Sequence, residues 1–132
     1  MKKVISAIAI ALLTVIAMPV LKSVAAGSAD GSYRLEIKYS KFSSADPRCE
    51  GYLFPEPMIV SDGKVTGTLR HNRRGLVFLN GTVATDGILT ATGQGNSVEG
   101  EITGKLTKDG GSGTWKETHV LFCDGTWTAK PE

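Results

Sequence analysis

Few residues of this chain could do covalent chemistry, and its two cysteines are the first candidates. Cys49 and Cys123 are the only cysteines among 132 residues. In an oxidising compartment, two cysteines in a small domain usually pair, whereas a redox-active pair usually has the Cys-x-x-Cys spacing. Their wide separation predicts a structural disulfide. It would close a loop of about 75 residues and stabilise the fold by about 4 kcal/mol.

The two histidines, His71 and His119, are candidates for metal binding or general base catalysis. With both cysteines oxidised, a metal site would need carboxylates beside the histidines, and no ligand spacing of that kind is present. No serine or threonine stands in a recognisable arrangement with a base, as nucleophilic catalysis requires. The sequence therefore predicts no metal, no cofactor and no enzymatic activity.

Arg70, His71, Arg73 and Arg74 form the one local concentration of positive charge. Such a cluster could contact an anionic group, such as a phosphate, a carboxylate or an acidic protein patch. Because it falls in a polar loop between two expected strands, we favour a second interpretation, a solvated hairpin tip.

Trp115 and Trp127 each end a Gly-Thr-Trp unit near the C-terminus. We favour packing in the core or at a barrel end for both rings. The alternative is that they line a ligand site, as aromatic residues do in small-molecule barrels.

The chain begins with the pattern of a secretory signal. Lys2 and Lys3 precede an almost wholly apolar stretch over residues 4–17, and small residues follow up to Ala26. This order is typical of a signal peptide, so we expect cleavage after Ala26 and a bacterial protein of the periplasm or the cell exterior. The alternative is a retained anchor, although a spanning helix needs about 20 apolar residues.

Cleavage would leave a signal peptide of residues 1–26 and a single domain of residues 27–132. The whole chain has 15 basic and 13 acidic residues, a net charge of +2. Three of the lysines lie within the first 26 residues, so the exported domain has a net charge of −1. Nucleic-acid binding depends on a concentrated basic face, and we therefore exclude nucleic acid as a partner.

The domain itself has the pattern of a β-meander. Alternate residues from Tyr33 to Tyr39 are apolar or aromatic, which indicates a half-buried strand. Turn residues then recur every 8–12 positions, as in a sandwich or barrel. We expect an all-β fold, a single up-and-down antiparallel meander of about eight strands that forms a curled sheet or a small barrel. The expected strands are 33–39, 58–60, 64–70, 76–83, 88–92, 98–106, 113–119 and 122–129.

Two features interrupt this regularity. Residues 43–57 contain Cys49 and three prolines, and prolines are excluded from central strands, so we expect an irregular segment tied down by the disulfide. Glycines also recur inside the expected strands, where they mark bulges, bends or close approach of other groups, and we favour bends. These glycines are Gly67, Gly81, Gly93, Gly100, Gly104, Gly113 and Gly125.

The order of motifs resembles that of a family of small glycine-rich secreted bacterial proteins of unknown function. The chain has an opening Asp-Gly-x-aromatic motif at residues 30–33 and a single cysteine at Cys49. Gly-x-Gly-Thr-Trp follows at residues 111–115, and Cys-x-Gly-x-Trp-x-Ala closes the chain at residues 123–129. The resemblance covers nearly all of the expected domain. It implies export and a disulfide-closed β domain, and it implies no activity.

The sequence is thus most consistent with an exported, non-enzymatic module that binds a protein or an envelope component. A second hypothesis is a carrier barrel that holds a small apolar ligand near Trp115 and Trp127. An enzyme is the third, and no feature of the sequence points to it.

Overall fold

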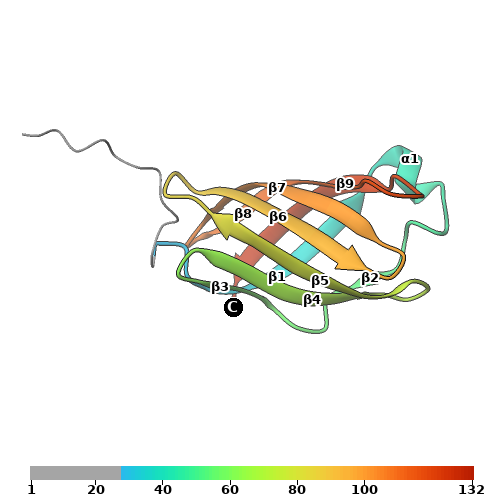
Figure 1. The fold of residues 1–132 in the computed structure, drawn as a ribbon. Helices are drawn as coiled ribbons and strands as arrows, with labels where there is room; N and C mark the ends of the chain where they lie inside the picture. Colours follow the sequence, from blue (N-terminus) through green and yellow to red (C-terminus); the bar gives the residue numbers. More distant parts are fainter. Residues whose placement is uncertain (1–27) are drawn as a thin grey trace, which may run out of the picture.

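The computed structural model describes residues 28–132, so the predicted signal peptide and its cleavage site lie outside the described residues. Within that part of the chain, strands account for nearly all regular structure (Figure 1). The elements are β1 (Gly31–Tyr39), α1 (Lys41–Ser44), β2 (Tyr52–Leu53), β3 (Met58–Ser61), β4 (Lys64–His71), β5 (Gly75–Val83), β6 (Ile88–Gly95), β7 (Glu99–Thr107), β8 (Gly110–Glu117) and β9 (Asp124–Pro131).

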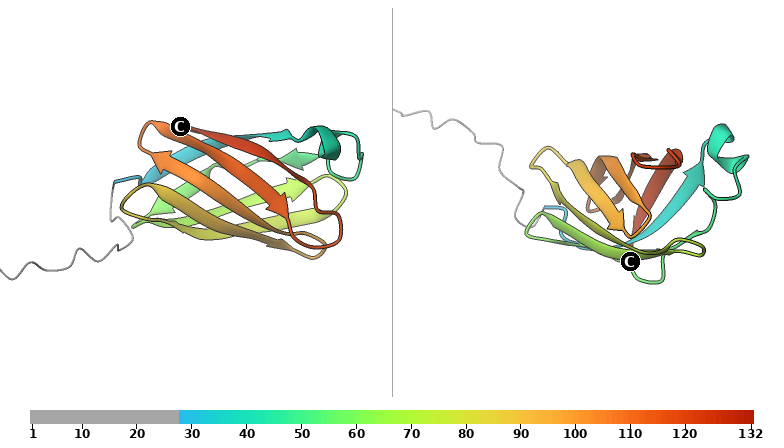
Figure 2. Two further views of the ribbon diagram at one scale, coloured as in Figure 1. Left: turned by 90° about the horizontal axis from the view of Figure 1, so that it is seen from above. Right: turned by 45° about the vertical axis from the view of Figure 1, so that its right-hand side comes forward.

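The strands form a closed antiparallel barrel, which confirms the all-β prediction and answers whether the sheet closes. Going round the wall, the order is β1, β3, β4, β5, β6, β7, β8 and β9, and β9 pairs with β1 to complete the circle (Figure 2). The short β2 is an additional strand. It pairs only with the end of β4, at Tyr52↔His71 and Leu53↔Arg70.

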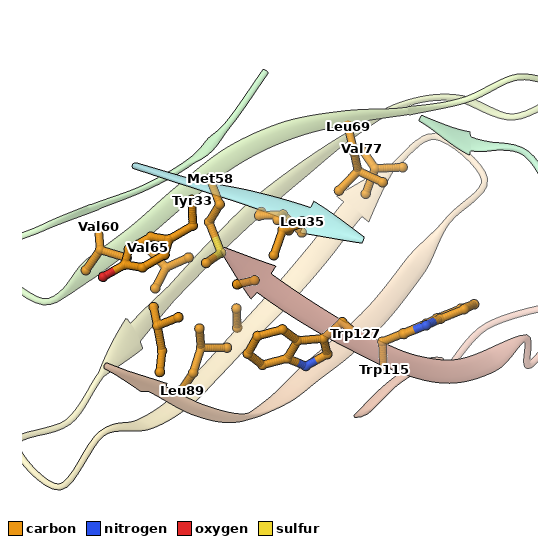
Figure 3. Packing of buried hydrophobic residues seen from close by; sticks show 14 of the residues in the cluster. Tyr33, Leu35, Met58, Val60, Val65, Leu69, Val77, Leu89, Trp115 and Trp127 are labelled. Atoms are coloured by element: carbon orange, nitrogen blue, oxygen red, sulfur yellow. The ribbon is translucent and has the colours of Figure 1, made fainter. Parts of the chain in front are cut away.

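Alternation along each strand places one set of side chains inside the barrel. In β1 the inward set is Tyr33, Leu35, Ile37 and Tyr39, as the sequence pattern predicts. Figure 3 shows Trp127 in the middle of this core, Trp115 towards one end, and Tyr33 near Val60 towards the other. Small barrels are filled in this way by side chains from every strand.

Close approach of other groups explains the interior glycines except Gly67, so for these the favoured interpretation of bends needs correction. A Cβ on Gly104 or Gly113 would lie 2.7 Å from the Trp127 indole, and one on Gly125 would lie 2.9 Å from Trp115 Nε1. Gly104 and Gly113 are also paired across β7 and β8. The two indole rings therefore rest on strand backbone at positions where no side chain fits.

The disulfide between Cys49 and Cys123 is present, as predicted, with Cα atoms 5.5 Å apart. It anchors the β8–β9 loop, in which Val120 and Phe122 have positive φ angles of 68° and 56°. Such left-handed conformations cost about 1–2 kcal/mol for residues with a side chain. A hydrogen bond of 2.6 Å from the Glu117 N–H to the Cys123 carbonyl helps to hold this loop.

The strand ends differ from the predicted ones where local sequence is ambiguous. The eighth expected strand, at residues 122–129, runs instead from Asp124 to Pro131, and the seventh runs from Gly110 to Glu117. Residues 43–57, predicted to be irregular, include the end of α1 and the short β2. No helix in the described part of the chain is long and apolar enough to cross a membrane.

Candidate functional site

The barrel wall is incomplete along one side of β1. On its β9 side, β1 is paired from Tyr33 to Tyr39. On its other side it pairs with β3 only from Gly31 to Tyr33, because β3 is a four-residue strand. Past that point the second half of β1 runs apart from β4, as the views in Figures 1 and 2 agree.

The second half of β1 therefore has a free edge. Its even-numbered residues bond with β9, as shown by the 2.9 Å hydrogen bond from the Glu132 N–H to the Ser32 carbonyl. In an antiparallel pair the backbone groups of alternate residues point to opposite sides. The N–H and C=O groups of Leu35, Ile37 and Tyr39 thus point away from β9, and no backbone group within residues 28–132 pairs with them.

The segment opposite this edge cannot close the wall with hydrogen bonds. Residues 54–57 connect β2 to β3 and contain Pro55 and Pro57, which have no backbone N–H to donate. Only the end of the gap is bridged, where the Tyr39 hydroxyl accepts hydrogen bonds from the backbone N–H groups of Gly51 at 3.2 Å and Tyr52 at 3.0 Å. We call this opening, between residues 35–39 and residues 52–57, the β1 window.

An apolar hollow lies behind the β1 window. The hollow has a volume of about 60 Å³, is partly open to solvent and has an almost wholly apolar lining. A second pocket of about 640 Å³ borders the edge of β1 at residues 35–39; its lining is partly polar and includes the outward-facing Ser112, Thr126 and Thr128 of β8 and β9. Residues that line the hollow include Leu35, Ile37, Phe54, Ile102, Trp115 and Trp127.

Trp115 and Trp127, the two predicted candidates for ligand lining, both border the hollow. Each indole N–H is used by the protein: Trp127 Nε1 donates to the Thr103 carbonyl at 3.0 Å, and Trp115 Nε1 donates to the Thr126 carbonyl at 3.2 Å. Their orientation is therefore set before anything binds. A ligand would meet the ring faces and edges rather than the N–H groups.

Tyrosine rings hold Trp115 at the end of the hollow. The centroid of Tyr39 lies 5.6 Å and that of Tyr52 lies 5.7 Å from the centroid of Trp115, and both pairs are edge-to-face. Aromatic pairs favour this geometry, which adds about 0.5–1.5 kcal/mol to the burial of their surface.

A buried ion pair lies just beyond this aromatic group. Glu117 is only 3% exposed, and its carboxylate accepts hydrogen bonds from Arg74 Nη2 at 2.7 Å and the Tyr52 hydroxyl at 2.8 Å. Arg74 Nη1 contacts the other carboxylate oxygen, which makes the pair bidentate. The hydrogen bond to Glu117 raises the pKa of the Arg74 guanidinium. Burial, together with the adjacent carboxylate, raises the pKa of Tyr52.

The predicted cluster around Arg70 is divided by the fold. Arg70 and Arg73 are exposed, so an anionic contact there stays a prediction. His71 is 1% exposed and Arg74 pairs with Glu117, so the solvated-tip interpretation is wrong for these two residues. His71 points inwards because it lies two residues after the buried Leu69 in β4, and alternate residues of a strand share one face. Arg74 follows in the short β4–β5 turn, which folds it back over the end of the barrel.

His71 is neutral in this arrangement. The Arg73 backbone N–H donates to Nδ1 at 3.2 Å, so the ring proton lies on Nε2, which donates to the Cys49 carbonyl at 3.3 Å. Burial, and then the charge of Arg74, lowers the pKa of His71.

The carboxylate of Glu117, the Tyr52 hydroxyl and the two Nη atoms of Arg74 are matched to one another, whereas the buried Nε of Arg74 has no hydrogen-bond partner among the described residues. Tyr52 keeps its proton because it donates to Glu117, and Glu117 is held by Arg74. Within residues 28–132 no group of three or more His, Cys, Asp or Glu side chains could hold a metal ion.

Sequence reasoning missed Tyr52, Phe54 and Glu117. Tyr52 and Phe54 lie in the proline-rich segment, where no periodicity indicates which side chains point inward. The sequence did indicate the position of Glu117, because it lies two residues after Trp115 in β8 and its side chain therefore points inwards as that of Trp115 does. A carboxylate at an inward position must find a cation, because an unpaired buried charge is strongly unfavourable.

Fold and site together define a class: a small disulfide-closed antiparallel β-barrel with an apolar interior that opens sideways through its wall. No family model, curated protein or solved structure matches the chain. The resemblance to glycine-rich secreted proteins stays a prediction.

Proposed function

We propose that this protein is an exported, non-enzymatic binding module that takes an apolar group of its partner into the hollow behind the β1 window. The observation that supports this is a preformed, apolar hollow bordered by two fixed indole rings and open to solvent on one side. Concave apolar sites with few polar groups are the usual form of binding sites.

The size of the hollow favours a side chain or similar group over a whole lipid or a cofactor. One water molecule needs a cavity of about 10–15 Å³, and sites for drug-sized molecules have volumes of about 300–1,000 Å³. The hollow, at about 60 Å³, holds only a few methyl or methylene groups. The pocket of about 640 Å³ beside the edge of β1 lies within that range, but its lining is partly polar and includes outward-facing residues, so a carrier that encloses a small apolar ligand is the weaker candidate.

Action after export, in the periplasm or outside a bacterial cell, is part of this proposal. Its support is the disulfide between Cys49 and Cys123, since disulfides persist in oxidising compartments and are rare in the cytosol. The signal-peptide pattern in the sequence points the same way.

Binding of small apolar probes tests the hollow as a site. We expect benzene, indole and 1-butanol to shift the indole N–H signals of Trp115 and Trp127 in NMR spectra, saturably and without a change of fold. Ile102→Phe should weaken this binding by about tenfold, equivalent to about 1.4 kcal/mol, because the larger ring occupies space in the hollow.

Ile88→Phe is the matched control. Ile88 is 42% exposed on the outer face of β6, so the same change there should leave probe binding as it is. Absence of any saturable shift at both indole signals would show that the hollow is not a binding site.

A further inference from the structure

An occupant of the β1 window meets two kinds of chemistry side by side. The inward side chains of Leu35 and Ile37 border the apolar hollow. The backbone N–H and C=O groups of the same residues form the unpaired edge. A hydrocarbon could fill the hollow, but it would leave these polar groups without partners, which is unfavourable when water is displaced.

We propose that the occupant is an extended peptide segment of a partner protein, which adds as a strand to the free edge of β1 at Leu35, Ile37 and Tyr39. This inference rests on the proposed function and names the class of partner. An extended chain presents donors and acceptors at the two-residue spacing of the edge. Its alternate side chains would point into the hollow, as in other cases of strand addition.

The outer face of β1 adds a charge pattern to this edge. Glu36 and Lys38 point outwards, and their neighbours across β9 are the uncharged Thr128 and Thr126. Neither residue forms a salt bridge within the described part of the chain. A strand on the free side could place a basic residue opposite Glu36 and an acidic one opposite Lys38, and such cross-strand pairs contribute about 0.2–1 kcal/mol each.

The fold itself keeps this position open. Proline and a break in pairing are features that protect strand edges from other chains, and here the prolines lie opposite the edge, in residues 54–57, rather than on it. The free edge borders a hollow that Tyr52 and Phe54 also line. Because residues 52–57 lie opposite the edge, a narrow extended segment fits it better than the wall of a second barrel does.

Amide hydrogen exchange of the purified protein gives the first test. The amides of Leu35, Ile37 and Tyr39 should exchange faster than those of Glu36 and Lys38, which are bonded to β9. Equal protection of the two sets would mean that the edge is already satisfied, and it would overturn the proposal.

A synthetic peptide supplies the second test. A capped peptide with the sequence of residues 33–41 can lie antiparallel to β1, centred on Ile37, so that its glutamate faces Lys38 and its lysine faces Glu36. At about ten times its dissociation constant it should slow exchange at Leu35, Ile37 and Tyr39 about tenfold. N-methylation of its alternate residues that face β1 should abolish the effect, whereas N-methylation of the intervening residues should preserve it.

A charge exchange tests the register. The double variant Glu36→Lys and Lys38→Glu should bind this peptide several-fold more weakly, because two cross-strand pairs become like-charged. A peptide with the same exchange should restore binding. The control is Glu99→Lys with Lys105→Glu on the outer face of β7, which should have no effect.

The outcomes separate this inference from the proposed function. If apolar probes bind while the peptide protects no amide of the edge, the peptide proposal is overturned and the hollow remains a binding site. If neither the apolar probes nor the peptide binds, both the proposed function and the peptide proposal fail. If protection of the edge instead rises with protein concentration together with a doubling of mass, the occupant is a second copy of the chain and the peptide proposal is wrong.

Discussion

At the scale of single residues, His71 shows how burial and hydrogen bonding together select one protonation state. Its Nδ1 accepts from the Arg73 backbone N–H and its Nε2 donates to the Cys49 carbonyl. A second ring proton would face the Arg73 N–H, and the guanidinium of Arg74 adds a nearby positive charge. The folded protein therefore disfavours the imidazolium.

Stability should fall in mild acid because of this residue. Burial lowers the pKa of His71 in the folded state, so the unfolded chain takes up the proton at higher pH, near its ordinary value of about 6.5. The contribution of neutral His71 to the free energy of unfolding is complete above about pH 6.5 and is lost as the pH falls towards the pKa of His71 in the folded state. Urea unfolding at pH 7.5 and pH 5.5 should show the loss.

His71→Gln should reduce this pH dependence, because the amide can donate and accept without titrating in this range. The control is His119→Gln, since His119 is exposed in the β8–β9 loop. An equal pH dependence in the wild type and in His71→Gln would refute the assignment.

At the scale of elements, the paired glycines of β7 and β8 determine where the Trp127 ring lies. Gly104 and Gly113 are opposite each other, and the indole covers both. A side chain at either position would displace the ring or the neighbouring strand. Gly67 in β4 is different, because a Cβ there would meet nothing closer than Leu79 Cδ1 at 3.4 Å.

Alanine substitution should separate these two kinds of glycine. Gly113→Ala would bring its Cβ to 1.9 Å from the Thr103 carbonyl oxygen and to 2.7 Å from Trp127 Nε1, and overpacking of this kind costs about 1–3 kcal/mol. Gly67→Ala should be close to neutral, because it fits and also restricts the unfolded chain. Urea unfolding followed by tryptophan fluorescence measures both. Equal destabilisation by the two changes would contradict the close packing of β7 and the Trp127 ring against Gly113.

At the scale of the whole molecule, the disulfide joins segments 74 residues apart, and the barrel is closed independently by the pairing of β1 with β9. The bond holds the irregular segment around Cys49 against the start of β9. Its main effect should therefore be on stability and on the β8–β9 loop, with the strand content unchanged.

Replacement of Cys49 and Cys123 by alanine should lower the free energy of unfolding by about 2–5 kcal/mol, a large part of a total of about 5–15 kcal/mol. Far-UV circular dichroism should remain that of a β-barrel, while the guanidinium midpoint falls. Reductant should reproduce the loss in the wild type and have no effect on the double variant. A wild type whose midpoint stays the same after the bond has been fully reduced would show that the bond does not contribute.

Local patterns in the sequence were sufficient for several features of this molecule. The alternation from Tyr33 to Tyr39 predicted which side chains of β1 point inwards, and the recurring turn residues predicted a meander. The only two cysteines predicted the disulfide. Each of these depends on residues close in sequence, or on a pairing with no alternative partner.

Tertiary structure alone decided the closure of the barrel, the pairing of Arg74 with Glu117 and the free edge of β1. These features depend on the register between strands that lie far apart in the chain. The alternation of apolar and polar residues shows which side chains of a strand share a face, but it does not show which residues of two strands lie opposite each other. The length of β3 decides where the edge of β1 becomes free, and the path of residues 52–57 decides what lies opposite it. For the same reason, Tyr52 and Phe54 could be placed beside the hollow only after the strands around them had been positioned.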